Sequence, residues 1–367
     1  SAETTYTLSS LTTDVSYYAY ATPITTTISP TDVVSKTVKY STSAQTIVDV
    51  QAANGGGKWT YSLTGTNADK FSLSVTSETT GKVTVSLNAG VAVGSYVCQV
   101  KATSAYNGTS ATTGNITVTV TNADLTGSVA ISGTAKYAET LTATVTGQIS
   151  GTSLSYAWYS NTSNSATGGT AIANATSSTY TIGKGLVGKY IYVVVTMSKA
   201  NYTTKTVTAI ASSTVSARAV SISSVTASST VTKVYDGNTT VKQTFTASIS
   251  GVLSGDTVTY TFSSASYDNA NVGTDKTVNV TFAVSGADKD NYSCQLSTTT
   301  KGSITAASVT LTVDASKTVV YGSTATVSYK ANVAGTFTIT SNSTEYVTVA
   351  TGYTTSAAAN TAYTFTI

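Results

Sequence analysis

The segment Lys82-Val83-Thr84-Val85-Ser86-Leu87 alternates polar and aliphatic side chains, and Asn115-Ile116-Thr117-Val118-Thr119-Val120-Thr121 repeats this alternation. A period of two places successive side chains on opposite faces of a strand, as in a sheet with one buried face. Residues 59–63 and 95–102 alternate in the same way. Turn-forming residues separate these segments, at Gly55-Gly56-Gly57, Thr80-Gly81, Asn88-Ala89-Gly90 and Asn107-Gly108. Short alternating strands joined by such turns predict a β-sandwich.

The same rhythm recurs along the chain and predicts several sandwich modules in tandem. With about 100–200 residues per domain, a chain of 367 residues holds two to four domains. The pattern divides the sequence into an N-terminal arm at 1–31, modules at 32–122, 123–217 and 218–306, and an incomplete module at 307–367. This last segment stops at Ile367 within a strand pattern, so we expect that one of its strands is missing.

Composition favours a folded, secreted β-protein. Hydrophobic residues make up 40% of the chain and charged residues 10%, and 24 tyrosines accompany 6 phenylalanines. The net charge of +3 comes from scattered lysines rather than a basic stripe, which argues against nucleic-acid binding. No apolar run approaches the ~18 residues of a membrane span. The start at Ser1-Ala2-Glu3 is compatible with a cleaved leader, and we expect an extracellular, cell-surface location.

The sequence offers little for catalysis. Histidine is absent, which removes the commonest general base and the imidazole metal ligands. Asp275, Asp288 and Asp290 lie in a turn-rich region, and we interpret them as solvated carboxylates, with a weak cation contact as the alternative. We therefore expect no catalytic residues, no metal site and no cofactor, and a protein that is not an enzyme.

Two cysteines, Cys98 and Cys294, lie in different modules. The alternation places Cys98 on the same face as Tyr96 and Val100, and places Cys294 beside Tyr292. Both are predicted to be buried thiols within the core. An intermolecular disulfide is the alternative.

The second module carries an ordered set of strand motifs. Leu154-Ser155-Tyr156-Ala157-Trp158-Tyr159 is followed by Ala171–Ile182 and then by Val187-Gly188-Lys189-Tyr190-Ile191-Tyr192-Val193. This order resembles bacterial Ig-like repeats over about 125–215. The resemblance implies an Ig-like sandwich, and Trp158 is expected in its core. The paired cysteines of antibody-type domains are lacking, so the core must be held by packing alone.

The third module holds four ordered motifs. They are Lys233-Val234-Tyr235-Asp236-Gly237-Asn238, Leu253-Ser254-Gly255-Asp256-Thr257-Val258, Asn271-Val272-Gly273-Thr274-Asp275-Lys276 and Ser285-Gly286-Ala287-Asp288-Lys289-Asp290-Asn291-Tyr292. Together they resemble the YDG repeat of large bacterial surface proteins over about 233–305. Asp236-Gly237 and Gly255-Asp256 are interpreted as turns, and Tyr235 and Tyr292 as core aromatics near strand ends.

The first module, at about 33–121, is similar to cadherin-like bacterial repeats through Tyr61-Ser62-Leu63-Thr64-Gly65 and Ala68-Asp69-Lys70-Phe71. It departs from cadherins at Thr121-Asn122-Ala123-Asp124, where one carboxylate falls short of the six to eight oxygens that calcium prefers. The fourth segment, at about 307–367, resembles the start of another Ig-like repeat. The expected fold class is all-β, with tandem Ig-like/cadherin-like β-sandwich modules in an elongated array.

The N-terminal arm has strand-like segments and no module of its own to complete. Open sheet edges accept strands from other chains, so we expect this arm to complete the fourth module of a neighbouring subunit. The residues expected at this contact are Tyr6, Leu8, Tyr17, Tyr18, Tyr20, Ile24, Ile28, Phe365 and Ile367. The resulting hypothesis is a structural subunit of a filament, sheath or surface layer that associates with itself. The alternatives are the stalk of a large adhesin and a module that binds cell-surface glycans through the arm tyrosines.

Overall fold

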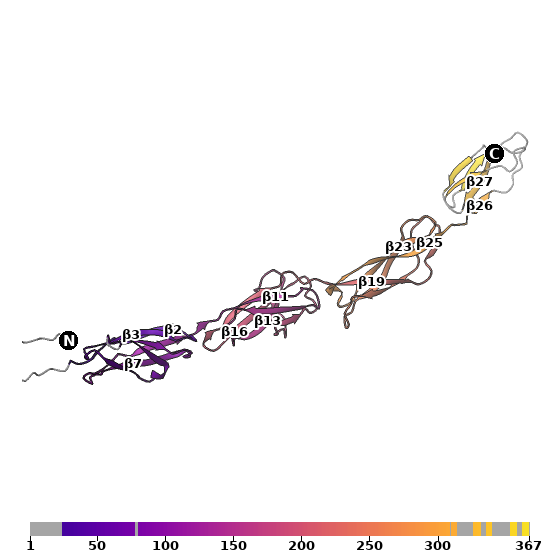
Figure 1. Ribbon diagram of the computed structural model, residues 1–367. Helices are drawn as coiled ribbons and strands as arrows, with labels where there is room; N and C mark the ends of the chain where they lie inside the picture. Colours follow the sequence, from indigo (N-terminus) through magenta and orange to yellow (C-terminus); the bar gives the residue numbers. More distant parts are fainter. Residues whose placement is uncertain are drawn as a thin grey trace, which may run out of the picture. The chain divides into compact units, whose positions relative to one another are not determined.

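The computed structural model describes residues 24–77, 80–308, 310–313, 326–331, 335–339, 353–357 and 362–366, from residue 311 onward by backbone alone. Its described residues form β-strands and two single-turn 3-10 helices, η1 (Ala68–Lys70) and η2 (Lys289–Asn291). They confirm the all-β fold class of tandem sandwiches (Figure 1). No helix in these ranges is both long and apolar enough to cross a membrane.

Contacts divide the chain into two compact units. Unit 1 comprises 1–135, 140–181 and 189–214. Unit 2 comprises 136–139, 182–188 and 215–367. Two short loops of the second sequence module, 136–139 and 182–188, are thus grouped by their contacts with the third module.

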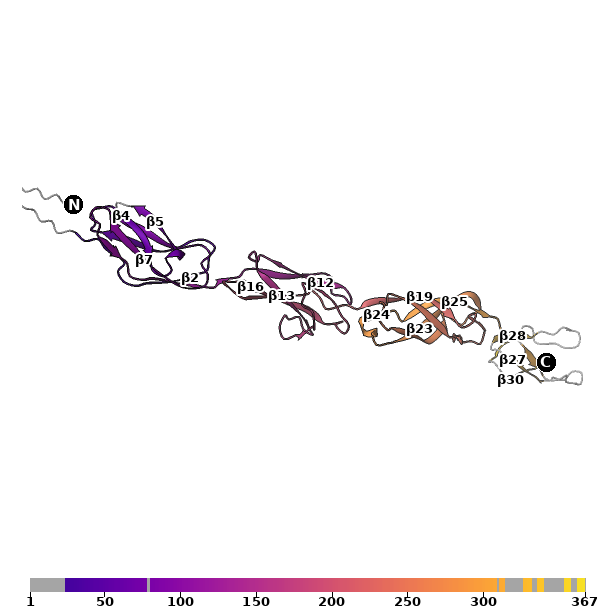
Figure 2. The same ribbon diagram turned by 90° about the horizontal axis from the view of Figure 1, so that it is seen from below.

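In unit 1, the first sandwich consists of two sheets (Figure 2). One sheet has the order β1 (Thr27–Ser29), β3 (Gln45–Ala53), β6 (Lys82–Leu87) and β5 (Phe71–Ser77). The other has the order β2 (Val34–Lys39), β9 (Ile116–Thr121), β7 (Gly94–Ser104) and β4 (Trp59–Thr64), with β8 (Ser110–Thr112) paired to β7.

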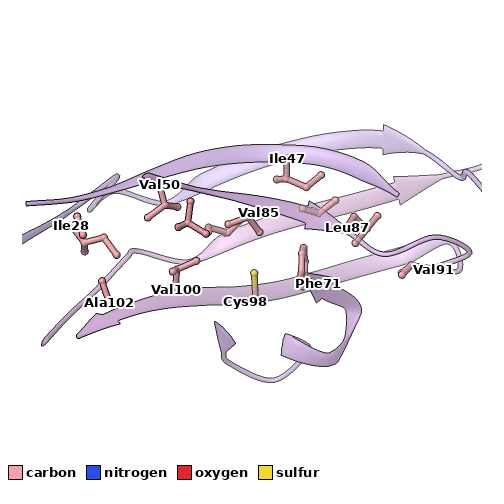
Figure 3. Close-up of a cluster of buried hydrophobic side chains, with 14 of the residues drawn as sticks. Ile28, Ile47, Val50, Phe71, Val85, Leu87, Val91, Cys98, Val100 and Ala102 are labelled. Atoms are coloured by element: carbon pink, nitrogen blue, oxygen red, sulfur yellow. The ribbon is translucent and has the colours of Figure 1, made fainter. Parts of the chain in front are cut away.

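The core of this sandwich follows from the period-two pattern. Val83, Val85 and Leu87 of β6 are buried in one cluster with Cys98 and Val100 of β7. Figure 3 shows Val85 and Leu87 in the interior, on the side of β6 that faces Cys98 and Val100. The alternate residues of β6 lie nearer the surface. Removing a valine or leucine side chain from water contributes about 1.5–3 kcal/mol, so the alternation itself sets which face is inside.

The boundary of the N-terminal arm requires a correction. Thr27–Ser29 forms β1 and pairs antiparallel with β3, where Ile28 lies opposite Ala52. The Ile28 side chain is buried in the first core and is not available to a neighbouring subunit. The arm was expected to reach residue 31, but its last part belongs to the first sandwich.

The second sandwich also lies in unit 1. One sheet has the order β11 (Ser128–Ser132), β12 (Thr140–Thr146) and β15 (Thr179–Thr181). The other has the order β14 (Thr170–Ala171), β13 (Ser153–Asn161), β16 (Tyr190–Ser198) and β18 (Lys205–Ile210). Trp158 is buried as predicted, and its indole N–H donates to the Ser177 carbonyl at 2.9 Å. A short parallel pair, β10 (Ala123–Asp124) with β17 (Tyr202–Thr203), lies where the first module passes into the second.

The third sandwich forms most of unit 2. One sheet has the order β21 (Phe245–Ser250), β19 (Arg218–Ala227) and β24 (Tyr292–Cys294). The other has the order β20 (Thr232–Val234), β25 (Ser297–Thr305), β23 (Gly273–Ser285) and β22 (Thr259–Tyr267). Its main core contains Val278, Val280 and Phe282 of β23, with Tyr235 packed at its margin.

Five strands are described in the last segment. They are β26 (Leu311–Val313), β27 (Thr326–Ala331) and β30 (Ala362–Thr366) in one sheet, and β28 (Gly335–Ile339) with β29 (Tyr353–Ala357) in another. Phe365 of β30 lies opposite Val327 of β27 in an antiparallel ladder.

Candidate functional site

Two carboxylates are buried at one end of the third sandwich, within unit 2. Asp256 follows the Ser254-Gly255 turn, and Asp288 immediately precedes η2. Their side chains are 6% and 11% exposed. A buried carboxylate is costly unless it is paired and hydrogen-bonded, so the partners of these two groups decide what the site does.

Lys184 supplies the compensating charge. It lies in the loop 182–188, which joins β15 to β16 in the chain and belongs by its contacts to unit 2. Its ammonium nitrogen lies 2.7 Å from Asp256 Oδ1 and 2.8 Å from Asp288 Oδ1. One cation therefore bridges two carboxylates.

Two tyrosines complete the coordination of Asp256. The hydroxyls of Tyr137 and Tyr292 donate to Asp256 Oδ2 at 2.7 Å and 2.5 Å. Their rings meet edge to face, with centroids 5.5 Å apart. Tyr137 lies in the loop 136–139 between β11 and β12, so the second short loop of unit 2 contacts the same carboxylate.

Main-chain bonds hold both loops in place. In the loop 182–188, the Gly185 N–H donates to Asn291 Oδ1 at 2.8 Å and the Gly188 N–H donates to the Val215 carbonyl at 2.9 Å. In the loop 136–139, the Tyr137 N–H donates to the Ser216 carbonyl at 3.0 Å. The Tyr137 and Tyr292 rings form an apolar cluster with Val220. Ala138 and Val187 of the two loops pack against this cluster.

The geometry shifts the ionisation of the cluster. Hydrogen bonds from Lys184 and Tyr292 lower the pKa of Asp256 to about 2. The Lys184 ammonium and the Thr257 N–H lower the pKa of Asp288. Burial, reinforced by Asp256, raises the pKa of Tyr137 to about 12, and the two carboxylates raise the pKa of Lys184. Both carboxylates are thus ionised and Lys184 is protonated at neutral pH.

Part of this cluster lies within a stretch that matches a known domain family. Residues 216–301 match the YDG domain family. The match begins ahead of the Lys233 motif and takes in all of β19, and it contains Asp256, Asp288 and Tyr292. Tyr137 and Lys184 lie outside it, so the YDG domain provides the carboxylates and the preceding module provides the cation.

Two solved structures are reported as similar. One is a crystal structure of domains from titin, with 13% identity over 52% of this chain and 66% of that chain and a TM-score of 0.21. The other is an ICAM-5 ectodomain fragment, with 10% identity over 93% of this chain and 91% of that chain and a TM-score of 0.32. No curated protein sequence matches the chain.

The expected assembly residues are only partly covered. Tyr6, Leu8, Tyr17, Tyr18, Tyr20 and Ile367 lie outside the described residues. Ile24 is 66% exposed, and its carbonyl accepts a bond from Asn107 Nδ2 at 2.9 Å. Ile28 is buried, as stated above, and Phe365 is placed in β30 by its backbone.

The interpretation of Asp288 as a solvated turn carboxylate is wrong, because Asp288 is buried and bridged by Lys184. Asp290 does lie at the surface, where it pairs with Lys289. Tyr137, Lys184 and the ionic role of Asp256 were missed.

Both cysteines are free. Cys98 is fully buried as predicted, and burial raises the pKa of its thiol to about 11, so it is neither accessible nor reactive as a thiolate. Cys294 is only half-buried, which corrects the expectation of full burial. It packs beside Tyr260 at the margin of the Tyr137–Tyr292 cluster.

Proposed function

We propose that this protein is an extracellular structural component of the cell surface, a repeat-module subunit of a filament, sheath or surface layer. The observation that carries the proposal is the ionic cluster of unit 2, whose charged groups bind one another and tie loops of one sequence module to the YDG domain of the next. The role of such a site is to hold successive sequence modules together. YDG and Ig-like domains are in general non-catalytic, which agrees with this role.

The resemblance of the first, second and fourth segments to cadherin-like and bacterial Ig-like repeats supports a surface location. Modules of this kind recur in surface proteins as spacers and lattice units. Self-association remains the proposed partner relation, with the N-terminal arm as donor and the fourth segment as acceptor. With β1 assigned to the first sandwich, the arm available for donation is 1–23 and its short extension to β1. Head-to-tail joining of this kind gives open filaments unless the rotation closes a ring.

Deletion of residues 1–23 tests the assembly. The deletion leaves β1 and the buried Ile28 in place, so the first sandwich is retained. We expect the full chain to polymerise, as seen by light scattering and electron microscopy, and the deletion variant to stay monomeric with an unchanged circular dichroism spectrum. Polymerisation by the deletion variant would contradict strand donation from the arm.

The stalk of a large adhesin is the alternative. The bridge from Lys184 to Asp256 and Asp288 favours it, because a stalk also needs contacts that hold successive modules together. A full chain that remains monodisperse at high concentration would support the stalk. Retention on a polysaccharide column that is lost in a Tyr18→Ser, Tyr20→Ser variant would instead support glycan binding by the arm.

A further inference from the structure

We propose that the acidic end of the YDG domain is a recognition site for the module before it, and that it selects a neighbour presenting one tyrosine and one lysine. This inference is independent of whether the protein forms filaments or stalks. The selecting residues are Asp256, Asp288 and Tyr292, and the selected residues are Tyr137 and Lys184.

The YDG domain holds its carboxylates ready without help from the neighbour. Asp288 Oδ2 accepts the Thr257 N–H at 2.8 Å, and the Tyr292 hydroxyl donates to Asp256 while accepting the Leu253 N–H at 3.0 Å. All of these groups belong to the YDG match. The outward oxygens, Oδ1 of each carboxylate, remain for the incoming ammonium.

The chemistry of the site explains what it selects. Two ionised carboxylates that share one region repel each other, and a single cation between them removes most of that cost. An ammonium suits this position because its three donors can be directed to separate acceptors. The Lys184 side chain is 51% exposed, so it reaches the carboxylates from the surface without being part of a core.

The tyrosine adds a second criterion. The Tyr137 ring fills the apolar cluster beside Tyr292 and Val220, while its hydroxyl donates to the same carboxylate. Phenylalanine would fill the space without the bond, and serine would make neither contact. A neighbouring module must therefore match the site in both shape and charge. A module that lacks the tyrosine or the lysine leaves an unfilled space or unpaired carboxylates, and this penalty makes the site specific.

Cleavage of the chain between the two partners tests the proposal. Ser212 and Ser213 are exposed and lie just before the boundary of unit 2, so a protease site placed there leaves the cluster untouched. After cleavage of the 367-residue chain, we expect the two pieces to stay together on size-exclusion chromatography at micromolar concentration. Separation of the wild-type pieces at that concentration would overturn the proposal.

Variants show whether the cluster is responsible. Asp256→Asn together with Asp288→Asn is expected to weaken the association of the cleaved pieces by about 100-fold or more, because Lys184 loses both counter-charges. Glu139→Gln serves as the matched control, since Glu139 pairs with Arg218 at 3.6 Å in the same region but outside the cluster. Equal affinity of the double variant and the control would contradict selection by the carboxylates.

A chemical rescue separates recognition from a general loss of structure. Lys184 and the YDG match lie on different pieces after cleavage at Ser212–Ser213, so Lys184→Ala should leave the melting temperature of the isolated YDG piece unchanged. We expect n-butylammonium to restore the association of the cleaved Lys184→Ala pieces and tetramethylammonium, which has no N–H donors, to have no effect. Equal effects of the two cations, or no rescue by either, would overturn the assignment of an ammonium-binding site.

Discussion

The passage from the first sequence module to the second and the passage from the second to the third are built differently. In unit 1, where the first module meets the second, Lys39 pairs with Asp124 while their side chains are 62% and 70% exposed. Tyr40 meets Tyr202 edge to face at 5.4 Å, and the Val93 N–H donates to Asn201 Oδ1 at 3.0 Å. In unit 2, the side chains of Asp256 and Asp288 are buried and share Lys184, and two tyrosine hydroxyls donate to Asp256.

The two places contain similar residue types, so composition does not explain the contrast. An exposed ion pair contributes about 0–1 kcal/mol because water and salt screen it. A buried charge is strongly disfavoured without its partner, so the unit 2 cluster penalises a wrong neighbour far more than the unit 1 pair does. Burial therefore converts an ordinary pair of charges into a specific contact.

Replacing one tyrosine at each contact by alanine should give the largest difference between the two contacts in the free energy of unfolding. Tyr137→Ala removes a buried ring and one donor to Asp256, and we expect it to lower the free energy of unfolding of unit 2 by about 3–4 kcal/mol. Tyr40→Ala, the matched change in unit 1, removes a half-buried ring and should cost about 1 kcal/mol.

Hydrogen exchange is the suitable measurement for this pair. Both tryptophans of the chain, Trp59 and Trp158, lie in unit 1, so their fluorescence reports on that unit alone. Exchange at β19 and β24 reports on unit 2. Equal losses of protection at the two contacts would remove the distinction drawn between them.

Neutralising one carboxylate at each of the two contacts should give a smaller difference in stability. Asp256→Asn keeps the shape of the side chain but removes the charge that faces Lys184, and it should destabilise unit 2 by about 1–3 kcal/mol. Asp124→Asn should change the stability of unit 1 by no more than about 0.5 kcal/mol. Thermal unfolding in low and in high salt would check both values, since only the exposed pair should respond appreciably to salt.

Acid should weaken unit 2 through the same carboxylates. The pKa of Asp256 falls from an ordinary 3.8 to about 2 on folding, and that of Asp288 is also lowered. A depressed carboxylate pKa stabilises the folded state above the ordinary value, and this stabilisation is lost as the pH falls from about 4 to about 2. We expect exchange at β24 to accelerate over this range, and Asp256→Asn to flatten the change. An unaltered profile in the variant would show that other groups govern the acid response.

The strands were accessible to sequence analysis, and the cluster was not. Segments such as 82–87 and 59–63 appear as β6 and β4 because one buried face imposes a period of two on neighbouring residues. Asp256 and Asp288 sit in Gly-containing turns, where carboxylates are normally solvated, so local pattern gave no sign of burial. Their counter-charge lies in another module, and a single sequence does not pair residues across modules. Ile28 was assigned to a free arm because residues 1–31 showed no module of their own, and its partner Ala52 in β3 lies 24 residues further along the chain (52 − 28).

The smallest expected effect concerns backbone strain at the two contacts. Each contact contains a non-glycine residue in the left-handed region, Asn201 at φ 67° in unit 1 and Ala138 at φ 63° in unit 2. Asparagine tolerates this conformation, whereas alanine adopts it at a cost of about 1–2 kcal/mol. Ala138→Gly should therefore stabilise unit 2, by less than about 1 kcal/mol because glycine also gains freedom in the unfolded chain. Ala130→Gly, the same change in an exposed position of β11, should instead destabilise the protein by about 0.5–1 kcal/mol. If both substitutions destabilise equally, the cluster does not hold Ala138 against its backbone preference, and the stronger cohesion inferred for unit 2 loses one of its supports.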